Sequence, residues 1–315
     1  MKAVVFEKNG TPDQLVLREV EKPVPAENQV LIRVHAVSLN AADYRSMRMG
    51  IIPKSRIFGA DVAGRVVSTG SAVTMLKPGD AVAGDLSGCG FGGFAEYTAA
   101  PESVLALKPE NLSFEAAAAV PLAGVTALQG LRNVGQIQPG QRVLICGAGG
   151  GVGTYAVQIA KNFGARVTAV CGPRSVDLVR SLGADCVIDY SSEDFTRGPE
   201  RYDLILGVNG GSALSVYKRL LAPRGIYVMI GGPLRQVFSA ILFGPFMSLG
   251  SRKFRALAAK PNAKDTSYLL QLAAEGRLKA VIESSYPLEQ TPEAMRCVSQ
   301  GHTRGKVVIN IWKDQ

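Results

Sequence analysis

The sequence predicts an α/β protein in which a doubly wound parallel sheet is inserted between two parts of a mostly β domain. Three observations carry this prediction. The chain has 315 residues, of which 47% are hydrophobic, and this is enough for two packed cores. Short β-rich runs separated by turn residues fill the first third of the chain, whereas strand and helix patterns alternate after Pro139-Gly140. The C-terminal segment returns to the first pattern.

The individual elements follow from local patterns. In the first part we expect strands at 2–6, 30–36, 64–68, 81–84 and 94–98. Ser113 can cap a helix that runs through the alanines to Val120, before Pro121. In the middle we expect strands at 142–146, 166–170, 186–188, 204–208 and 226–230, with helices beginning near Gly151, Ser175 and Ser212. Near the end we expect a strand at 278–282, a helix from Thr291 and a strand at 306–311. The β domain then occupies 1–122 and 266–315, and the doubly wound domain occupies 123–265.

Composition narrows the classes of partner. The net charge of +9 favours anions, but the basic cluster at 252–264 has no interleaved aromatics for base stacking, so no nucleic acid is expected. The uncharged run 236–251 is too short for a transmembrane span and fits a core or interface segment, with peripheral membrane contact as the alternative. The N-terminus lacks a signal pattern and the five cysteines are scattered, which together predict a cytoplasmic protein with reduced thiols.

A glycine-rich turn follows the strand expected at 142–146. The run Gly147-Ala148-Gly149-Gly150-Gly151-Val152-Gly153 stands where a helix is expected to begin. Glycines at such a turn let the backbone approach a pyrophosphate, whose charge meets the free N–H groups of the helix. The spacing departs from the strict G-x-G-x-x-G fingerprint. We favour a dinucleotide site, and the alternative is glycines that serve only the turn and helix packing.

The next expected strand indicates which dinucleotide. It ends in Cys171-Gly172-Pro173-Arg174-Ser175, without the Asp or Glu that commonly holds the ribose 2′-hydroxyl of NAD. Arg174 is a planar cation suited to a 2′-phosphate, and Ser175 and Tyr190 are further donors. NADPH is therefore expected rather than NADH, and an exposed Arg174 without function is the alternative.

The order of several motifs along essentially the whole chain resembles the medium-chain dehydrogenase/reductase superfamily. Within it, the closest resemblance is to the zinc-independent quinone oxidoreductase branch, which also contains enone (2-alkenal) reductases. The motifs lie at 36–43, 59–64, 73–80, 92–97, 120–127, 147–153, 182–190 and 301–308. The resemblance implies a Rossmann domain inserted into a GroES-like catalytic domain, and an NADPH-dependent reductase of quinones or α,β-unsaturated carbonyls.

Alcohol dehydrogenases of this superfamily hold a catalytic zinc through a Cys, a His or Glu, and a second Cys or Asp. By resemblance, these positions fall at Asn40, at Ala60-Asp61 and near Leu122-Ala123. The four-cysteine lobe for a structural zinc is also missing, because the region after Asp80 contains only Cys89. The resemblance therefore implies an enzyme that works without zinc.

The resemblance also assigns residues to the cofactor. Near the nicotinamide or the phosphates it places Asn40, Arg45 and Thr126, and along the pyrophosphate it places Gly147, Ala148, Gly150, Gly151, Val152 and Gly153. Toward the adenosine phosphate come Cys171, Gly172, Arg174, Ser175 and Tyr190, and lining the nicotinamide pocket come Val208, Asn209, Gly231 and Gly232. Arg304 and Lys306 either contact the cofactor or complete the final strand.

Without a Lewis-acid metal, an alkoxide is hard to stabilise, whereas a conjugated acceptor delocalises negative charge onto an oxygen. Tyr44 and Asn40 are the catalytic candidates; Tyr44 is the candidate proton donor, with packing of its ring as the alternative and solvent as another proton source. Other functions to weigh are a non-enzymatic NADPH-binding protein, crystallin-like or recruited to a membrane or partner, and a zinc-type alcohol dehydrogenase. The apolar segment 237–249 and the resemblance suggest a homodimer.

Overall fold

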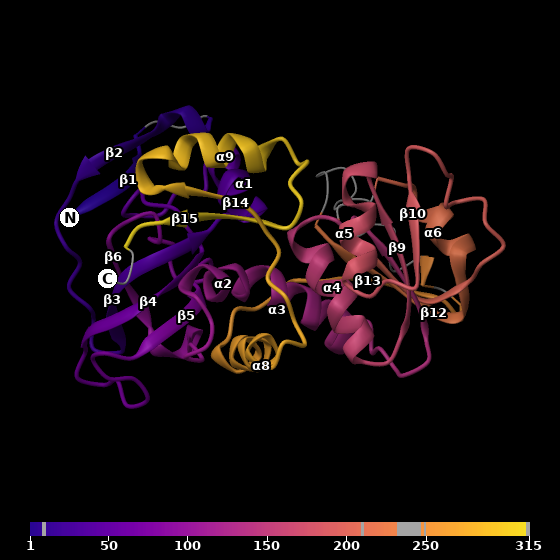
Figure 1. Ribbon diagram of the computed structural model, residues 1–315, viewed down its shortest axis with the longest axis horizontal. Helices are drawn as coiled ribbons and strands as arrows, with labels where there is room; N and C mark the ends of the chain where they lie inside the picture. The colour runs from indigo at the N-terminus through magenta and orange to yellow at the C-terminus, as the bar shows by residue number, and fades with distance from the viewer. Residues whose placement is uncertain (8–10, 209–210, 232–246, 249, 313–315) are drawn as a thin grey trace. The chain divides into compact units, whose positions relative to one another are not determined.

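The computed structural model describes residues 1–7, 11–208, 211–231, 247–248 and 250–312 (Figure 1). The chain folds into two compact units. Unit 1 comprises Met1–Val125, Lys260–Gly276 and Ala280–Gln315, and unit 2 comprises Thr126–Ala259 and Arg277–Lys279. Among the helices in the described ranges, none has the length and apolar character needed to cross a membrane. The apolar segment 237–249 lies almost wholly outside the described residues.

Unit 1 is built on a seven-stranded, mostly antiparallel sheet, in which six strands follow the order β14-β15-β3-β4-β5-β7 and the seventh, β6, pairs with β3. The long strand β3 organises it, because its first half pairs with β6 and its second half with β15. A separate hairpin joins β1 and β2. The strands are β1 (Lys2–Phe6), β2 (Leu15–Glu19), β3 (Gln29–Ser38), β4 (Asp61–Thr69), β5 (Ala81–Asp85), β6 (Tyr97–Pro101), β7 (Leu105–Leu107), β14 (Ile282–Pro287) and β15 (Lys306–Asn310).

Helices cover this sheet and close its core. They are α1 (Ala41–Met49), α2 (Phe114–Ala119), α8 (Ala263–Ala274) and α9 (Thr291–Ser299), and α3 (Pro121–Gln129) begins in this unit. The predicted cap of α2 is confirmed, since Ser113 Oγ accepts a hydrogen bond from the Ala116 N–H at 3.1 Å. Helix α9 lies along β14 and β15 (Figure 1). Val30, Ile32, Val34 and Val37 of β3 are buried, as expected for a central strand.

Two strands predicted from the sequence begin later in the structure than expected. The strand expected at 94–98 begins only at Tyr97, because the Phe94 N–H bonds to the Phe58 carbonyl before the chain joins β3. The strand expected at 278–282 begins only at Ile282. Just before it, the backbone of Lys279 pairs with the Gln158 side chain, at 2.7 and 3.0 Å, instead of with a neighbouring strand.

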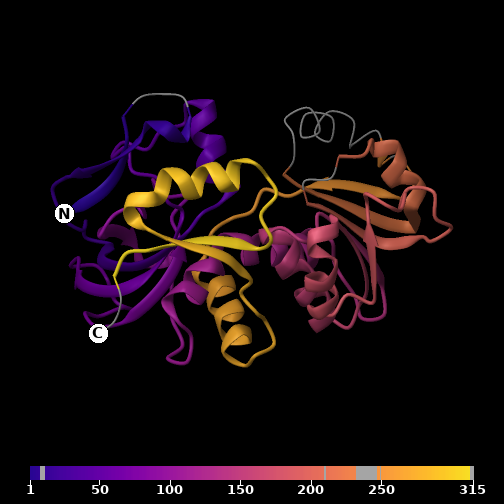
Figure 2. The same cartoon turned by 45° about the horizontal axis from the view of Figure 1, so that its top comes forward.

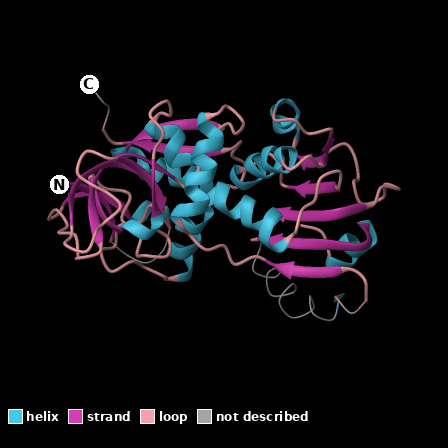
Figure 3. Ribbon diagram, turned by 90° about the horizontal axis from the view of Figure 1, so that it is seen from below, coloured by secondary structure: helices cyan, strands magenta, loops and turns pink. Residues whose placement is uncertain are grey.

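Unit 2 is a six-stranded parallel sheet in the order β10-β9-β8-β11-β12-β13, and its arrows run in one direction in Figure 3. This confirms the predicted fold class. The strands are β8 (Arg142–Cys146), β9 (Arg166–Cys171), β10 (Cys186–Asp189), β11 (Tyr202–Val208), β12 (Leu221–Ile230) and β13 (Lys253–Ala256). The helices are α4 (Gly151–Asn162), α5 (Val176–Ser181) and α6 (Leu214–Leu220), with a π-helical turn at Gly130–Val134.

The strand order of unit 2 has a reversal near its middle. From β8 the chain proceeds outward through β9 to β10, and from β11 it proceeds in the other direction through β12 to β13. Right-handed crossovers then put α4 and α5 on one face and α6 on the other, as Figure 2 shows. The order reverses between β8 and β11, which is the switch point where such sheets bind ligands at the carboxyl ends of their strands.

Candidate functional site

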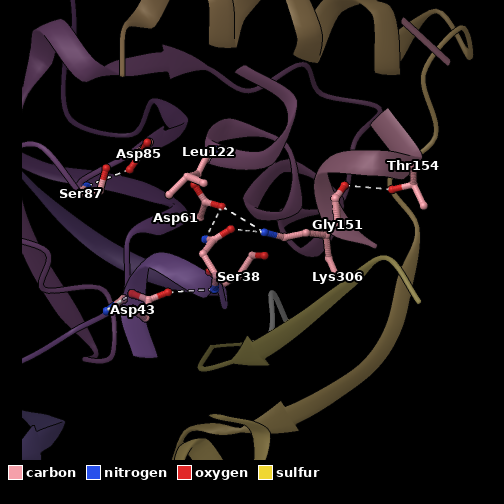
Figure 4. Close-up of polar contacts among 11 residues, drawn as sticks. Ser38, Asp43, Asp61, Asp85, Ser87, Leu122, Gly151, Thr154 and Lys306 are labelled. Carbon is pink, nitrogen blue, oxygen red and sulfur yellow. Dashed lines mark hydrogen bonds and ion pairs between the residues drawn. The ribbon is translucent and has the colours of Figure 1, made fainter. Parts of the chain in front are cut away.

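A buried polar cluster lies in unit 1, where the ends of four strands, β3, β4, β5 and β15, meet the start of α1 (Figure 4). Its charged or amide side chains are Asn40, Asp43, Asp61, Asp85 and Lys306, and each is at most 5% exposed. Charged groups are almost never buried this completely unless they are paired. The hydrogen bonds of each member therefore decide what the cluster can do.

Asn40 stands at the centre of this cluster. Its Nδ2 donates to Asp61 Oδ2 at 2.8 Å and to the Ser38 carbonyl at 3.1 Å, while its Oδ1 accepts from Lys306 Nζ at 2.5 Å. An ammonium only donates, so this contact fixes which end of the carboxamide is the oxygen. Both amide hydrogens are thus used inside unit 1, and Asn40 keeps no N–H for a further acceptor.

Asp43 ties α1 to the segment before β4. Its Oδ2 accepts from the Asn40 N–H at 2.8 Å and its Oδ1 accepts from the Gly59 N–H at 3.1 Å. Burial nevertheless raises the pKa of Asp43 to about 7, against the lowering effect of these two backbone hydrogen bonds. Asp43 therefore holds the start of α1 against the segment before β4 through these two hydrogen bonds.

Lys306 and Asp61 form the ion pair of the cluster. Lys306 Nζ lies 3.5 Å from Asp61 Oδ2, and the other oxygen of Asp61 accepts from the Leu122 N–H at 2.8 Å. Burial raises the pKa of Asp61 to about 7, and the charge of Lys306 opposes this rise. Burial likewise lowers the pKa of Lys306, against the attraction of the carboxylates. Each charge thus depends on its partner.

Asp85 is a member of the cluster that the sequence analysis missed. It ends β5, is 5% exposed, and accepts from the Ser87 N–H at 2.8 Å. Burial raises the pKa of Asp85. A carboxylate that ends the apolar strand run Ala81-Val82-Ala83-Gly84 was a visible signal, because buried Asp is rare without a specific partner.

The three positions expected for zinc ligands do come together. Asn40, Asp61 and Leu122 are joined through the two oxygens of Asp61. Their donor set does not fit zinc, which favours Cys, His and carboxylate ligands in a tetrahedral arrangement. One position offers a carboxamide, one is apolar, and the single carboxylate already faces an ammonium. No group of three His, Cys, Asp or Glu side chains within the described ranges is arranged to hold a metal ion.

The glycine turn of unit 2 links β8 to α4 at the switch point. Gly147 has φ of +83°, and a Cβ there would lie 2.1 Å from the Val208 carbonyl oxygen. Cβ atoms at Gly149 and Gly153 would lie 2.5 Å from Ser175 and 2.1 Å from the Gly147 carbonyl oxygen. At these three positions, the backbone of the turn or its packing against Val208 and Ser175 requires glycine.

Gly150 differs from these three. It caps α4 with extended backbone angles, φ −84° and ψ 178°, which any residue can adopt. A Cβ there would meet only the Gly147 carbonyl oxygen, at 3.8 Å, an ordinary contact. The position faces the first turn of α4, whose N–H groups have no acceptor within the helix. Gly150 therefore leaves room for an anion from outside the chain.

The carboxyl end of β9 carries the residues expected at the adenosine phosphate. Arg174 is exposed in a short turn (Pro173–Ser175), and Ser175 is buried beneath it. The hydroxyl of Tyr190 lies against Gly172, where a Cβ would come within 2.8 Å of it. A cavity of about 400 Å³ opens beside Tyr190, lined by the residues 190–196 and Ser212. These groups lie at the carboxyl ends of the strands of unit 2.

The remaining predicted residues lie as follows. Tyr44 is half-buried against the core of unit 1, with the guanidinium of Arg45 5.8 Å from its ring centre. Thr126 is buried in α3, and Val208 ends β11 beside Gly147. Arg304 bonds to Glu283, with its Nε 3.2 Å from Oε1. Asn209 and Gly232 lie outside the described residues, whereas Gly231 has φ of +63° at the end of β12.

Comparisons with known proteins agree with this architecture. The family model for the alcohol dehydrogenase GroES-like domain matches residues 26–110, and that for zinc-binding dehydrogenases matches 182–309. A chloroplast envelope quinone oxidoreductase homolog of Arabidopsis thaliana is 35% identical over 92% of both chains. An NADPH-dependent alkenal/one oxidoreductase of the same plant is 35% identical over 98% of this chain and 79% of that one. The solved quinone oxidoreductase of Coxiella burnetii is 30% identical, with a TM-score of 0.87 over 99% of each chain.

A GroES-like unit together with a parallel Rossmann-type sheet defines a dehydrogenase or reductase of the medium-chain class. The chain belongs to the medium-chain dehydrogenase/reductase superfamily, in its quinone oxidoreductase and alkenal/one oxidoreductase branch. Its relatives are NAD(P)H-dependent oxidoreductases. The names of both Arabidopsis relatives place those proteins in the chloroplast, so a cytoplasmic location for this chain stays a prediction, as does the homodimer.

Proposed function

We propose that this protein is an NADPH-dependent reductase that passes a hydride to a quinone or to an α,β-unsaturated carbonyl compound without using a metal ion. When bound, NADPH would supply the hydride, that is, two electrons and one proton. The acceptor takes up this hydride at a ring position or at its β-carbon, and one proton from solvent or Tyr44 completes the reduction. After hydride transfer and before protonation, the negative charge lies on the acceptor's own oxygen. Hydrogen-bond donors or water are enough to stabilise it there.

The observation that carries the proposal is the open position of Gly150. If the glycines of the turn served only the fold, then at each of them a side chain would strain the backbone or clash with a neighbour. This is the case for Gly147, Gly149 and Gly153. At Gly150 neither reason applies, and the space that its missing side chain leaves lies at the N-terminus of a twelve-residue helix. A helix N-terminus with free N–H groups favours a phosphate group there. The turn therefore fits the pyrophosphate of a dinucleotide.

Metal independence rests on the donor set of the buried cluster. A zinc ion polarises a substrate oxygen directly, which requires ligands that hold the ion in an open site. Asn40 and Asp61 are instead bonded to each other and to Lys306. A conjugated acceptor is the substrate class that such a site can still serve, because its reduction does not generate a localised alkoxide. The relatives named for quinones and alkenals support this class.

Preference for NADPH rests on Arg174. A bidentate guanidinium–phosphate contact is a charge-assisted interaction that contributes roughly 1.5–3 kcal/mol. We expect Arg174→Ala to raise the dissociation constant for NADPH about 10- to 100-fold and to leave that for NADH within about threefold. Titration of the two cofactors by fluorescence measures both constants. Arg166→Ala, which removes an exposed arginine from the opposite end of β9, is the control. Equal losses for both cofactors in Arg174→Ala would contradict the assignment.

An acceptor screen tests the function itself. Purified protein, treated with a chelator, is mixed with NADPH or NADH and a panel of quinones, 2-alkenals and enones, and oxidation is followed at the nicotinamide absorbance band. We expect turnover with NADPH and at least one conjugated acceptor, and none with saturated alcohols and NADP⁺. Tight NADPH binding without any acceptor-dependent oxidation would instead support a non-enzymatic binding protein. Activity that disappears with the chelator and returns with zinc would support an alcohol dehydrogenase.

A further inference from the structure

The side chain of Lys306 reaches a buried position from the last strand of the sheet. Its ammonium contacts Asn40, which precedes α1, and Asp61, which begins β4. These partners lie 266 and 245 residues away in the sequence. The Lys306 side chain is 3% exposed and that of Asp61 is fully buried. An ammonium at this depth is tolerated only where carboxylate and amide oxygens replace its water shell.

The oxygens around this ammonium form a set that suits a cation. Asn40 Oδ1 and Asp61 Oδ2 contact it, and Asp43 and Asp85 add negative charge that it experiences through space. Ser38 belongs to the same cluster, because its carbonyl accepts from Asn40. The buried hydroxyl of Ser38 has no hydrogen-bond partner among the described residues. One amino group thus stands among carboxylate and amide oxygens of several segments.

We propose that Lys306 is the resident cation of this site: its ammonium holds Asn40 and Asp61 in place and keeps a divalent metal ion out. The ammonium is attached to the chain and therefore cannot dissociate from the folded protein as a bound metal ion can. The site thus stays filled whichever metal ions are present. Lys306 is a positioning residue, since its contacts are to Asn40 and Asp61. The inference deepens the proposed function, because it gives the physical reason why this site works without metal.

The first test measures the energetic coupling between Lys306 and Asp61 by denaturant unfolding. We expect Lys306→Met and Asp61→Asn each to raise the unfolding equilibrium constant about 100-fold or more, because each leaves a buried charge without its partner. The double variant should lie within about tenfold of the wild type, since it removes both charges. Lys54→Met, which removes an exposed ammonium from the same unit, should change little. A double variant as unstable as the sum of the two single variants overturns the proposal.

The second test asks whether a metal ion can replace the ammonium. Lys306→Ala removes the charge and leaves space beside oxygen ligands, which suit Mn²⁺. We expect millimolar Mn²⁺ to raise the melting temperature of Lys306→Ala by roughly 3 °C or more, and to leave the wild type and Lys306→Ala/Asp61→Asn unchanged. If Lys306→Ala folds only with Mn²⁺, the proposal is also supported. A variant that shows no response to Mn²⁺, folded or not, overturns it.

These measurements use neither NADPH nor an acceptor. The proposal on Lys306 and the proposed reductase function can therefore fail separately. A Mn²⁺ response in Lys306→Ala together with an inactive wild type would retain the resident cation and reject the reductase. An active wild type, together with a Lys306→Ala variant that does not respond to Mn²⁺, would retain the reductase and reject the resident cation.

Discussion

Replacing Gly147 by alanine is expected to destabilise unit 2 by roughly 3 kcal/mol or more. Two costs add at this position. The backbone has φ of +83°, where a Cβ meets its own carbonyl, and the new methyl group would lie 2.1 Å from the Val208 carbonyl oxygen. Neither obstacle is the flexible end of a side chain, so relief requires β8 or β11 to move. Urea unfolding followed by circular dichroism measures the loss.

Gly150→Ala is the matched control in the same turn. Its backbone angles suit alanine and the methyl group meets nothing closer than 3.8 Å, so stability should stay within about 1 kcal/mol of the wild type. The same methyl group would occupy the space offered to the pyrophosphate, and the dissociation constant for NADPH should rise about tenfold or more. Stable Gly150→Ala protein with unchanged NADPH affinity would remove the main support for the cofactor site.

The contrast between these glycines shows where sequence patterns stop being informative. The run from Gly147 to Gly153 predicted a strand-to-helix turn, and β8 and α4 have the expected boundaries. Which of these glycines the fold requires depends in part on Val208 and Ser175, which belong to other segments. Spacing along the chain contains no information on these neighbours. The reading of the turn as a packing requirement is confirmed at Gly147, Gly149 and Gly153, and its reading as a dinucleotide site stays a prediction.

The buried cluster marks a similar limit for the site. Family resemblance pointed to Asn40 and to Asp61 as positions where a metal ligand is replaced, and the structure joins them. The contact with Lys306 depends on the antiparallel register of β15 on β3, in which Val308 pairs with Ser38. Such a register between the two ends of a chain is decided by the packing of the whole sheet. The local sequence pattern could assign Lys306 to a strand, but it could not predict that its side chain contacts Asn40 and Asp61.

Strand boundaries were predictable where burial alone decides them. The apolar run at 142–146 is a strand with the expected bounds, because it lies in the middle of a parallel sheet. The run at 278–282 has a similar composition, yet its backbone bonds to the Gln158 side chain, and β14 starts later. A side chain of a distant helix thus outcompetes strand pairing there. No propensity within 278–282 reveals that competitor.

We also expect the free energy of unfolding to depend strongly on pH, and Asp43 is the clearest source of this dependence. Burial raises the pKa of Asp43 to about 7, whereas an aspartate in the unfolded chain titrates near 3.9. Between these values the folded state binds a proton that the unfolded state has lost. This contribution to stability is therefore complete below about pH 4 and is lost as the pH rises to about 7. Each such proton changes the free energy of unfolding by about 1.4 kcal/mol per pH unit.

Asp43→Asn isolates this proton. We expect the variant to be less stable at every pH. The side-chain amide has one acceptor oxygen for the two N–H groups of Asn40 and Gly59, and its NH₂ group would face the second N–H, donor against donor. Its stability should also fall less steeply than that of the wild type between pH 5 and 6, by about 1.4 kcal/mol per pH unit. Urea unfolding at closely spaced pH values gives both slopes.

Asp13→Asn controls for the loss of a carboxylate as such. Asp13 is exposed, and its hydrogen bond to Arg296 holds its pKa below the usual range. It has therefore lost its proton in both the folded and the unfolded state by pH 5, and its replacement should leave the slope between pH 5 and 6 equal to that of the wild type. If Asp43→Asn also keeps the wild-type slope, then Asp43 is ionised in the folded protein. The hydrogen bonds from Asn40 and Gly59 would in that case outweigh burial.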